Sequence, residues 1–452
     1  MSGLFSILTM TSHALDAQRA GLSVTGNNIA NLNTEGYSRR ALLLAESLIG
    51  GVEVQGIRAR RDLLLEARVR QEIPAEAREA ALADSLSVVE TALGRSGESI
   101  DGRLSAFFDG FSALASDPSS TVARDGVLQQ GRLLARSFND MAARLTSARR
   151  DADTQVRSGV NEVNALATRV ARLNQAIGGA IGGDAEALRD EREVALEQLA
   201  ELADVSVLHR DDGAVDVSIA GGRALVVGAD TYQVEVTSTP PAGLASLSIG
   251  GADITTSIAR GRLAGALDAR DTRLPAYQAR LDELAYGVAQ SVNTVHQGGF
   301  DLNGNPGQAF FAPLAGVAGA AAALQLDAAI DADPTLVAAS GTGAPGDNQT
   351  ARALADLRDT RTMSGGTSTF SESWGQLVYR VGSDTQTARA EQQSRHEVVA
   401  QVARLRDQVS GVSLDEESAN MLKFQRAYEA NARFFSTVNT VLDSLMSFVG
   451  AS

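Results

Sequence analysis

The sequence predicts a mainly α-helical protein with one inserted β-rich domain, and three observations lead to this fold class. Both ends carry apolar residues at heptad spacing, which is typical of helices that form a coiled coil. Long stretches between the ends keep the same three-and-four rhythm, which indicates a middle helical bundle domain. Residues 204–270 instead alternate apolar and polar side chains, as strands do. We therefore expect nested, discontinuous domains with the long terminal helices paired.

The N-terminal segment predicts a helix over residues 3–30 that runs into a turn. Apolar residues recur there at every seventh position: Leu8, Leu15, Leu22 and Ile29. The following turn is rich in residues that favour tight backbone conformations, and Gly36 can supply a positive φ. We expect this turn to bind partners through Asn31, Asn33, Gly36 and Tyr37. Residues 40–60 read as extended chain with a break at Gly50-Gly51.

The middle of the chain changes period twice. Helical patterns cover 62–94 with an interruption at Pro74, a stretch ending before Asp117-Pro118, then 121–177 and 185–203. Strand patterns follow, and Asp212-Gly213 is a hairpin signal between two of them. The helical period returns over 274–295. A Gly-, Ala- and Pro-rich interval covers about 298–346, and helical patterns resume from Asp347.

The C-terminal segment predicts one long helix that begins at Ser413. Ser413 and Glu416 form a capping box pattern, in which each side chain bonds the other residue's backbone N–H. An apolar seam with one polar member follows, and we expect it to pair with the N-terminal repeat and with neighbouring copies. Its members are Met421, Phe424, Tyr428, Asn431, Phe435, Val438, Leu442, Leu445 and Val449. Asn431 could fix the register of the pairing, or it could face water.

These patterns suggest the following domain boundaries. Residues 1–60 and 398–452 form a terminal coiled-coil assembly domain. Residues 61–203, 271–300 and 346–397 form the helical bundle, residues 204–270 form the β-rich insertion, and 301–345 form a β/loop segment beside the bundle.

Composition limits the classes of function. The chain has 452 residues, enough for several domains, and a formal charge of −15, which argues against nucleic acid or anionic membrane as the main partner. It contains no cysteine, so thiol chemistry is excluded. We recognise no secretory signal peptide and no apolar run long enough for a membrane span. Any export would therefore depend on a dedicated machine.

No segment carries a convincing catalytic, cofactor or metal motif. Residues 341–346 match G-x-G-x-x-G, but Pro345 interrupts the loop, and Asp347 places a negative charge where a pyrophosphate would bind. Asp301, Asn303 and Asn305 resemble half of a calcium loop whose remaining ligands are missing. The four histidines are scattered without metal-ligand spacing. We therefore expect no enzyme activity and no cofactor.

The two ends and one internal region resemble a known family. Residues 24–39, VTGNNIANLNTEGYSR, are similar to the N-terminal signature of bacterial flagellar axial proteins. Residues 413–428, SLDEESANMLKFQRAY, are similar to a C-terminal signature of the flagellar hook-associated protein 1 family. The segments DLNGNPG at 301–307 and APGDN at 344–348 resemble internal parts of that family. The β-rich region is where the family varies.

The resemblance implies a structural protein of the bacterial flagellum at the hook–filament junction, exported by the flagellar type III channel. It implies ring-like self-assembly by coupled folding of the terminal helices, contacts with hook protein and hook-associated protein 3, and a cytosolic chaperone on the C-terminal helix. The nearest alternative is a sister axial protein of the hook or distal rod. More distant alternatives are a nucleotide-binding enzyme that uses residues 341–346 and an intracellular coiled-coil scaffold.

Overall fold

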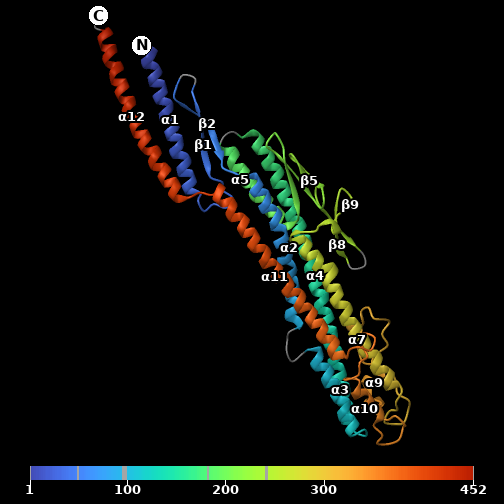
Figure 1. The fold of residues 1–452 in the computed structure, drawn as a ribbon. Helices are drawn as coiled ribbons and strands as arrows, with labels where there is room; N and C mark the ends of the chain where they lie inside the picture. The colour runs from blue at the N-terminus through green and yellow to red at the C-terminus, as the bar shows by residue number, and fades with distance from the viewer. Residues whose placement is uncertain (1, 48–49, 94–98, 181–182, 240–242, 451–452) are drawn as a thin grey trace.

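Long helices determine the shape of the molecule. The computed structural model describes residues 2–47, 50–93, 99–180, 183–239 and 243–450, and it forms a slender rod with both termini at one end (Figure 1). Helix α4 (Thr121–Gly179) has 59 residues and therefore extends about 89 Å, at about 1.5 Å per residue. The predicted fold class, mainly α-helical with an inserted β-rich part, is confirmed, and the structure shows that the strands form small antiparallel sheets.

The first and last helices pack side by side at the end of the rod that carries the termini. Helix α1 spans Ser2–Ala30 and α12 spans Leu414–Gly450, so the predicted pairing of the terminal helices is confirmed. A hairpin of β1 (Arg40–Glu46) and β2 (Val52–Ala59) packs along α1. We call α1, β1, β2 and α12 the terminal unit and the rest the body.

The body is built around antiparallel helices. Helix α2 (Leu63–Leu93) packs along α11 (Phe370–Ser410), and α5 (Gly183–Leu202) packs against α2 and α4. Helix α2 continues through Pro74, so the predicted interruption there is wrong. Pro74 removes one backbone hydrogen bond, at a cost of about 3 kcal/mol, but the long interface with neighbouring helices outweighs a single missing bond.

Two apolar cores share the long helix α4. The apolar stripe predicted along it is buried from Leu134 to Ile177, except for the half-buried Leu166. Its first half packs with α3 (Ile100–Ser116) and α7 (Leu274–Gln297), where phenylalanine rings from distant segments meet. Its second half packs with α5 and the sheets. One continuous helix therefore joins both cores.

The sheets form one side of the rod beside α4 and α5 (Figure 1). A four-stranded antiparallel sheet contains β3 (Val205–His209), β4 (Val215–Ile219), β5 (Arg223–Val227) and β6 (Asp230–Thr231). A three-stranded antiparallel sheet contains β7 (Glu235–Thr239), β8 (Leu244–Ile249) and β9 (Ala252–Asp253). The predicted turn at Asp212-Gly213 joins β3 and β4.

The strand region ends earlier than its pattern suggested. A 3₁₀ turn at Thr255–Ser257 is followed by α6 (Gly261–Asp268), and a π-helical turn at Ala269–Arg273 leads directly into α7. Gly261 begins α6 with a φ of +85°, and a Cβ there would contact the backbone of α5. The apolar spacing within α6 is too short to stand out in the sequence, because the helix has only eight residues.

The far end of the rod is a compact tip. Residues 298–369 contain the short helices α8 (Ala320–Ala323), α9 (Ala328–Ala332), η3 (Pro334–Leu336) and α10 (Gln349–Asp356), with isolated β-bridges between loops. His296 is fully buried beneath them. Its Nδ1–H donates to the Gln308 carbonyl at 2.6 Å, and its Nε2 accepts from the Ala338 amide at 2.9 Å. The ring is therefore held in its neutral form.

No helix in the described ranges is long and apolar enough to cross a bilayer.

Burial lowers the pKa of His296 to about 4, and this shift predicts how the tip responds to acid. In the unfolded chain the His296 imidazole takes up a proton as the pH falls below about 6.5, whereas in the folded chain it stays neutral down to about pH 4. The free energy of unfolding therefore falls as the pH drops from about 6.5 towards 4, by up to about 3 kcal/mol. His296→Gln should flatten this part of the pH dependence. Urea denaturation at pH 7 and pH 4.5 measures the effect, and equal pH slopes for the two proteins would contradict it.

Candidate assembly interface

The two terminal helices pack closely at a position where α1 lacks a side chain. A Cβ on Gly21 would lie 2.6 Å from ring atoms of Phe424 on α12. Because such a distance is too short for a real contact, only glycine lets the Phe424 ring pack this close to the α1 backbone. Ala17, Val24 and Asn28 are deeply buried near this contact and continue the same helical face.

Asn28 connects the end of α1 to the start of α12 and to the hairpin. Its Oδ1 accepts hydrogen bonds from the Arg40 amide at 2.9 Å and the Tyr37 hydroxyl at 2.8 Å. Its Nδ2 donates to the Arg40 carbonyl at 3.0 Å and to Glu417 Oε2 at 3.0 Å. The side chain is only 1% exposed, so these four bonds satisfy an amide that would be costly to bury alone.

Arg39 completes the connection by pairing with the first turn of α12. Its guanidinium lies 2.6 Å from Glu417 and 2.6 Å from Glu416, and its backbone amide donates to the Ser410 carbonyl at the end of α11. The Glu416 amide lies 3.5 Å from the Ser413 hydroxyl. The reciprocal half of the predicted capping box is wrong, because the Glu416 carboxylate binds Arg39 instead.

Asp190 on α5 fixes the base of the hairpin to the body. Its two oxygens bind the guanidinium groups of Arg40 and Arg61, each at 2.5 Å. The Arg40 guanidinium also lies 5.0 Å from the centre of the Tyr37 ring, within reach of a cation–π contact. Burial raises the pKa of the Tyr37 hydroxyl, which therefore stays protonated and donates to Asn28.

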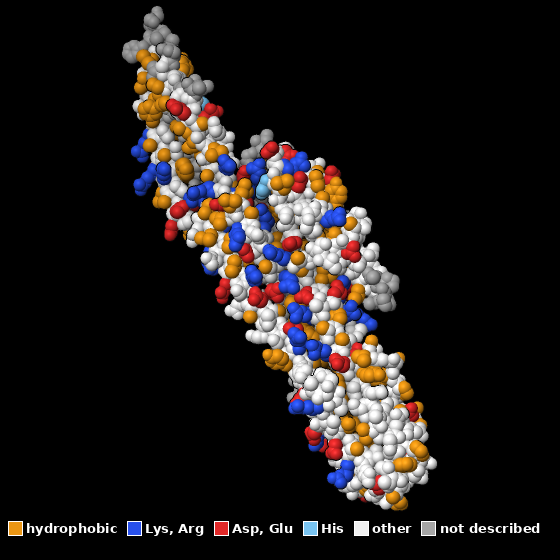
Figure 2. All heavy atoms as spheres, turned by 45° about the vertical axis from the view of Figure 1, so that its right-hand side comes forward, with side chains coloured by type: hydrophobic (Ala, Val, Ile, Leu, Met, Phe, Trp, Pro, Cys, Tyr) orange, Lys and Arg blue, Asp and Glu red, His pale blue; other side chains and the backbone are white. Residues whose placement is uncertain are grey.

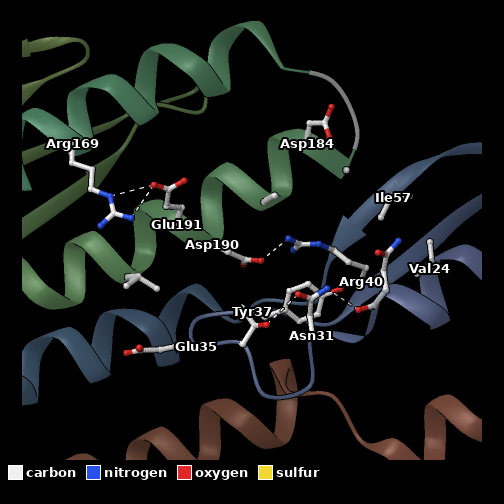
Figure 3. A pocket seen from close by; sticks show the side chains of 15 residues that line it. Val24, Asn31, Glu35, Tyr37, Arg40, Ile57, Arg169, Asp184, Asp190 and Glu191 are labelled. Atoms are coloured by element: carbon white, nitrogen blue, oxygen red, sulfur yellow. Dashed lines mark hydrogen bonds and ion pairs between the residues drawn. The ribbon is translucent and has the colours of Figure 1, made fainter. Parts of the chain in front are cut away.

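A mixed-charge cleft of about 830 Å³ separates the Asn-rich turn from α5 (Figure 3). Figure 3 shows Asn31, Tyr37 and Arg40 on one wall and Asp190 and Glu191 on the other, with Arg169 bound to Glu191. The Arg40–Asp190 pair crosses the cleft. Because the Arg40–Asp190 ion pair already bridges the two walls, this cleft joins the terminal unit to the body.

We call the connection made by Asn28, Arg39, Arg40, Glu417 and Asp190 the joint. A second charged cluster lies beneath the joint, between α2, α5 and α11. Burial, with Glu193 nearby, raises the pKa of Glu66 to about 7. Arg70 pairs with Glu193, and Arg406 on α11 binds Glu197 at 2.6 Å. The Arg406–Glu197 pair holds the end of α11 on α5, immediately before the chain turns into α12, and the Arg70–Glu193 pair holds α2 on α5.

The predicted assembly residues fall on two sides of the terminal helices. On α1, Leu8, Leu15, Leu22 and Ile29 are half-buried. Leu22 and Ile29 each follow directly after a residue of the contact face, Gly21 and Asn28. A step of one residue turns a helix by about 100°, so this stripe lies on the flank of the α1–α12 contact.

The α12 residues divide in a similar way. The structure buries Val438 and Leu442, half-buries four others, and exposes Tyr428 and Leu445; the half-buried residues are Met421, Phe424, Asn431 and Phe435. The Val449 side chain lies outside the described residues. In the turn, Asn31 and Tyr37 are half-buried while Asn33 and Gly36 are exposed, and Gly36 has the expected positive φ of +73°.

The network was only partly visible in the sequence. Asn28, Arg39, Arg40, Glu417 and Asp190 carry the joint but were not among the predicted site residues. All but Asp190 and Arg40 lie within the two signature segments. Asn28 and Glu417 could have been identified from the sequence, because each lies in one of two signature segments that were expected to pair. Asp190 could not, because in the sequence it looks like an ordinary acidic residue on the solvent face of a helix.

The alternative motifs have structural explanations. Asp347 occupies the Gly-rich loop itself, because its Oδ2 accepts from the Gly341 and Thr342 amides at 2.8 and 2.9 Å. The position where a phosphate would bind is therefore filled by the chain's own carboxylate. Asp301 accepts from the Asn303 and Asn305 amides at 2.8 Å, which makes a tight turn. Within the described residues no group of three metal-ligating side chains converges.

Comparisons with known protein families first define the class of protein to which this chain belongs. A model described as flagella basal body rod protein matches residues 9–37, and a model of the C-terminal part of flagellar basal body rod FlgEFG proteins matches residues 407–448. These ranges cover most of α1 and α12 and identify a flagellar axial protein. The flagellar hook-associated protein FlgK helical domain matches residues 86–311, half of the chain. The chain belongs to the flagellar hook-associated protein FlgK family.

Full-length relatives support this assignment. The chain is 25% identical to flagellar hook-associated protein 1 of Escherichia coli, over 98% of this chain and 99% of that protein. It is 27% identical to the Bacillus subtilis protein of the same name, over 100% and 99%. The structure of the flagellar hook junction protein FlgK from Burkholderia pseudomallei aligns with a TM-score of 0.66 at 16% identity, and covers 76% of this chain and 100% of that one. The chain is a structural protein of the flagellum, not an enzyme.

Neighbouring acids at the joint allow a matched test of the network. Glu417 is 2% exposed and paired, whereas the Glu416 side chain is 62% exposed. Glu417→Gln leaves Arg39 without its buried partner and should destabilise the joint by about 3 kcal/mol, whereas Glu416→Gln should change little. Hydrogen exchange over residues 410–424 measures this, and equal exchange in both variants would refute the role of Glu417.

The two glycines of α1 provide a second matched pair. Gly21→Ala places a methyl group against the Phe424 ring, and this overpacking should cost about 2 kcal/mol of α1–α12 stability. Gly26→Ala meets nothing within 4 Å and should stabilise α1 by about 0.5–1 kcal/mol through helix propensity. Protease resistance of α12 reports the difference. Similar behaviour of the two variants would show that close packing at Gly21 is unimportant.

Proposed function

We propose that this chain builds the junction between the flagellar hook and filament by folding its terminal unit together with neighbouring copies. Family membership places the chain in the flagellum as an axial structural protein. The mechanism of assembly is our proposal. It is carried by one observation, the distribution of exposed apolar side chains.

Exposed large apolar side chains gather in the terminal unit and at its joint with the body. Of 24 such side chains among the described residues, 17 lie within residues 5–64 or 405–446. Figure 2 shows orange side chains along the terminal helices at the upper end of the rod. Because water-exposed apolar area is unfavourable, this concentration supports a surface that other chains cover in the assembled state.

Each terminal helix carries a second apolar stripe beside the contact between them. On α1 this flank stripe is Leu8, Leu15, Leu22 and Ile29. On α12 it contains Phe434, Val441 and Leu445, which are 48%, 45% and 46% exposed. A helix with two stripes can pack between two partners, so one stripe serves the chain's own pair and the other serves a neighbour. This arrangement supports a continuous layer of terminal helices from many copies.

The resemblance to the family suggests which proteins lie on either side. We propose hook protein below the junction and hook-associated protein 3 above it, with a cytosolic chaperone covering α12 before export. The exposed stripe of α12 supports the last of these, because an apolar helix face needs cover until it is assembled. The matching family weakens the sister-protein alternative, and Asp347 in the Gly-rich loop weakens the nucleotide-binding alternative.

Complementation in a bacterium that lacks its own junction protein tests the proposal. The chain should restore filaments on hooks, which electron microscopy shows directly. Val441→Asp places a charge at a 45% exposed position of the α12 flank stripe, so it should abolish filaments while the isolated protein remains folded.

Tyr379→Asp is the matched control, because Tyr379 is 77% exposed on α11, away from the terminal unit. It should restore filaments as well as the unchanged chain does. Cells that lack hooks altogether would point to the hook or rod alternative. Filaments with Val441→Asp at the normal number per cell would remove the proposed role of the flank stripe.

A further inference from the structure

The hairpin carries a partly exposed apolar and acidic patch near its turn. We define the tip patch as Leu43, Leu44, Glu46, Val52 and Glu53, near the turn between β1 and β2. Leu43, Leu44 and Val52 are 43%, 48% and 36% exposed. Glu46 and Glu53 are exposed, and neither has an ion-pair partner in the part of the chain that the structure describes.

Strand pairing places the apolar and acidic residues of the tip patch on both faces of the ribbon. Glu46 pairs with Val52 and Ala45 with Glu53, so the two acids project from opposite faces of the ribbon. At the other end of the hairpin, Arg40 and Ala59 face the body and are buried. A two-stranded ribbon has no second layer of its own, and only its base is packed on both the terminal helix and α5.

A second patch, apolar and basic, lies at the base of the hairpin. We define the elbow patch as Arg60, Leu63, Leu64, Arg404, Leu405 and Val409. Leu64 is 82% exposed, Leu63 is 53% exposed, and Leu405 and Val409 are 44% and 40% exposed. Arg60 and Arg404 are exposed and form no ion pair with any described residue.

The members of the elbow patch share one level of the rod. Helices α2 and α11 run antiparallel, and Glu76 on α2 bonds His396 on α11 at 2.8 Å. Thirteen residues back along α2 lead to Leu63, and thirteen residues forward along α11 lead to Val409. Leu63 and Val409 therefore lie opposite each other, about 20 Å from that bond at about 1.5 Å per residue.

We infer that the tip patch of one copy docks on the elbow patch of a second copy of this chain. The patches are complementary, because two unpaired acids flank apolar side chains on one and two unpaired arginines flank apolar side chains on the other. They cannot meet within one chain, because the eight residues of β2 separate them by about 26 Å. Contact between two different patches repeats head-to-tail and generates rings or helical arrays.

This inference rests on the proposed function, and it specifies which surfaces of neighbouring copies meet. Leu43, Leu44, Leu63 and Leu64 are then buried by the next copy, in addition to the flank stripes of the terminal helices. The contact would link the terminal unit of one copy to the joint of another, so each docking event also covers the joint network.

Disulfide trapping tests the contact, because the chain has no cysteine of its own. Tagged Leu44→Cys protein and untagged Leu64→Cys protein are produced together, as full chains, in the strain that lacks its junction protein. Isolated flagella are oxidised, and mixed dimers are captured by the tag. The control partner is Val122→Cys, which is 81% exposed at the start of α4 in the tip. The Leu44–Leu64 pair should give about tenfold more mixed dimer than the control pair.

Charge reversal provides an independent readout. Glu46→Lys with Glu53→Lys should reduce the mixed dimer about tenfold, and Arg60→Glu with Arg404→Glu on the other chain should restore it. Equal dimer yields for the Leu64 and Val122 partners, or reversal without rescue, would overturn the inference. If filaments form without the mixed dimer, the proposed function survives and this contact does not.

If the unchanged chain restores no filaments, the proposed function fails by a separate observation. The same cysteine variants are then oxidised as concentrated purified proteins. A mixed dimer that exceeds the Val122 control there supports the contact, and its absence overturns it.

Discussion

The buried bond between Asn28 and Glu417 joins residues 389 positions apart, and the arrangement of the terminal unit depends on it. It fixes the end of α1 on the start of α12, and Arg39 and Arg40 extend the same network to the end of α11 and to Asp190 on α5. A buried carboxylate is tolerated only where charged and polar partners surround it. The network therefore specifies a single geometry for a joint that apolar packing alone would leave free to slide.

The body solves a different problem, which is how to remain rigid over a great length with few aromatic side chains. Helix α4 carries one apolar stripe through both cores, so one continuous helix connects the tip of the rod to the sheet region. The rings of Phe107, Phe111, Phe310 and Phe311 gather in the tip, where short helices and loops supply little regular packing. The terminal unit, by contrast, leaves much of its apolar surface uncovered, and that difference separates the rigid part from the part suited to assembly.

Charge placement follows the same division. The chain is acidic overall, yet the unpaired arginines of the elbow patch lie beside exposed leucines, and the tip patch of the hairpin carries the opposite charge. Exposed ion pairs add little stability within one chain, but unpaired charges on complementary patches can set the register between copies. A structural protein at the junction between hook and filament needs such register more than it needs affinity at any one contact.

Much of the fold was determined by the sequence itself. Heptad and period-two patterns fixed the long helices, the hairpin turn at Asp212-Gly213 and the β-rich interval, because these features depend on side chains within a few residues of one another. The signature segments also indicated the family.

Tertiary structure decided the rest. Helix α2 continues through Pro74 because of its neighbours, and Glu416 binds Arg39 rather than closing its own helix cap. Gly21 faces α12 at a point where the Phe424 ring leaves no room for a side chain. These outcomes rest on contacts between residues hundreds of positions apart, and local spacing carries no information about them.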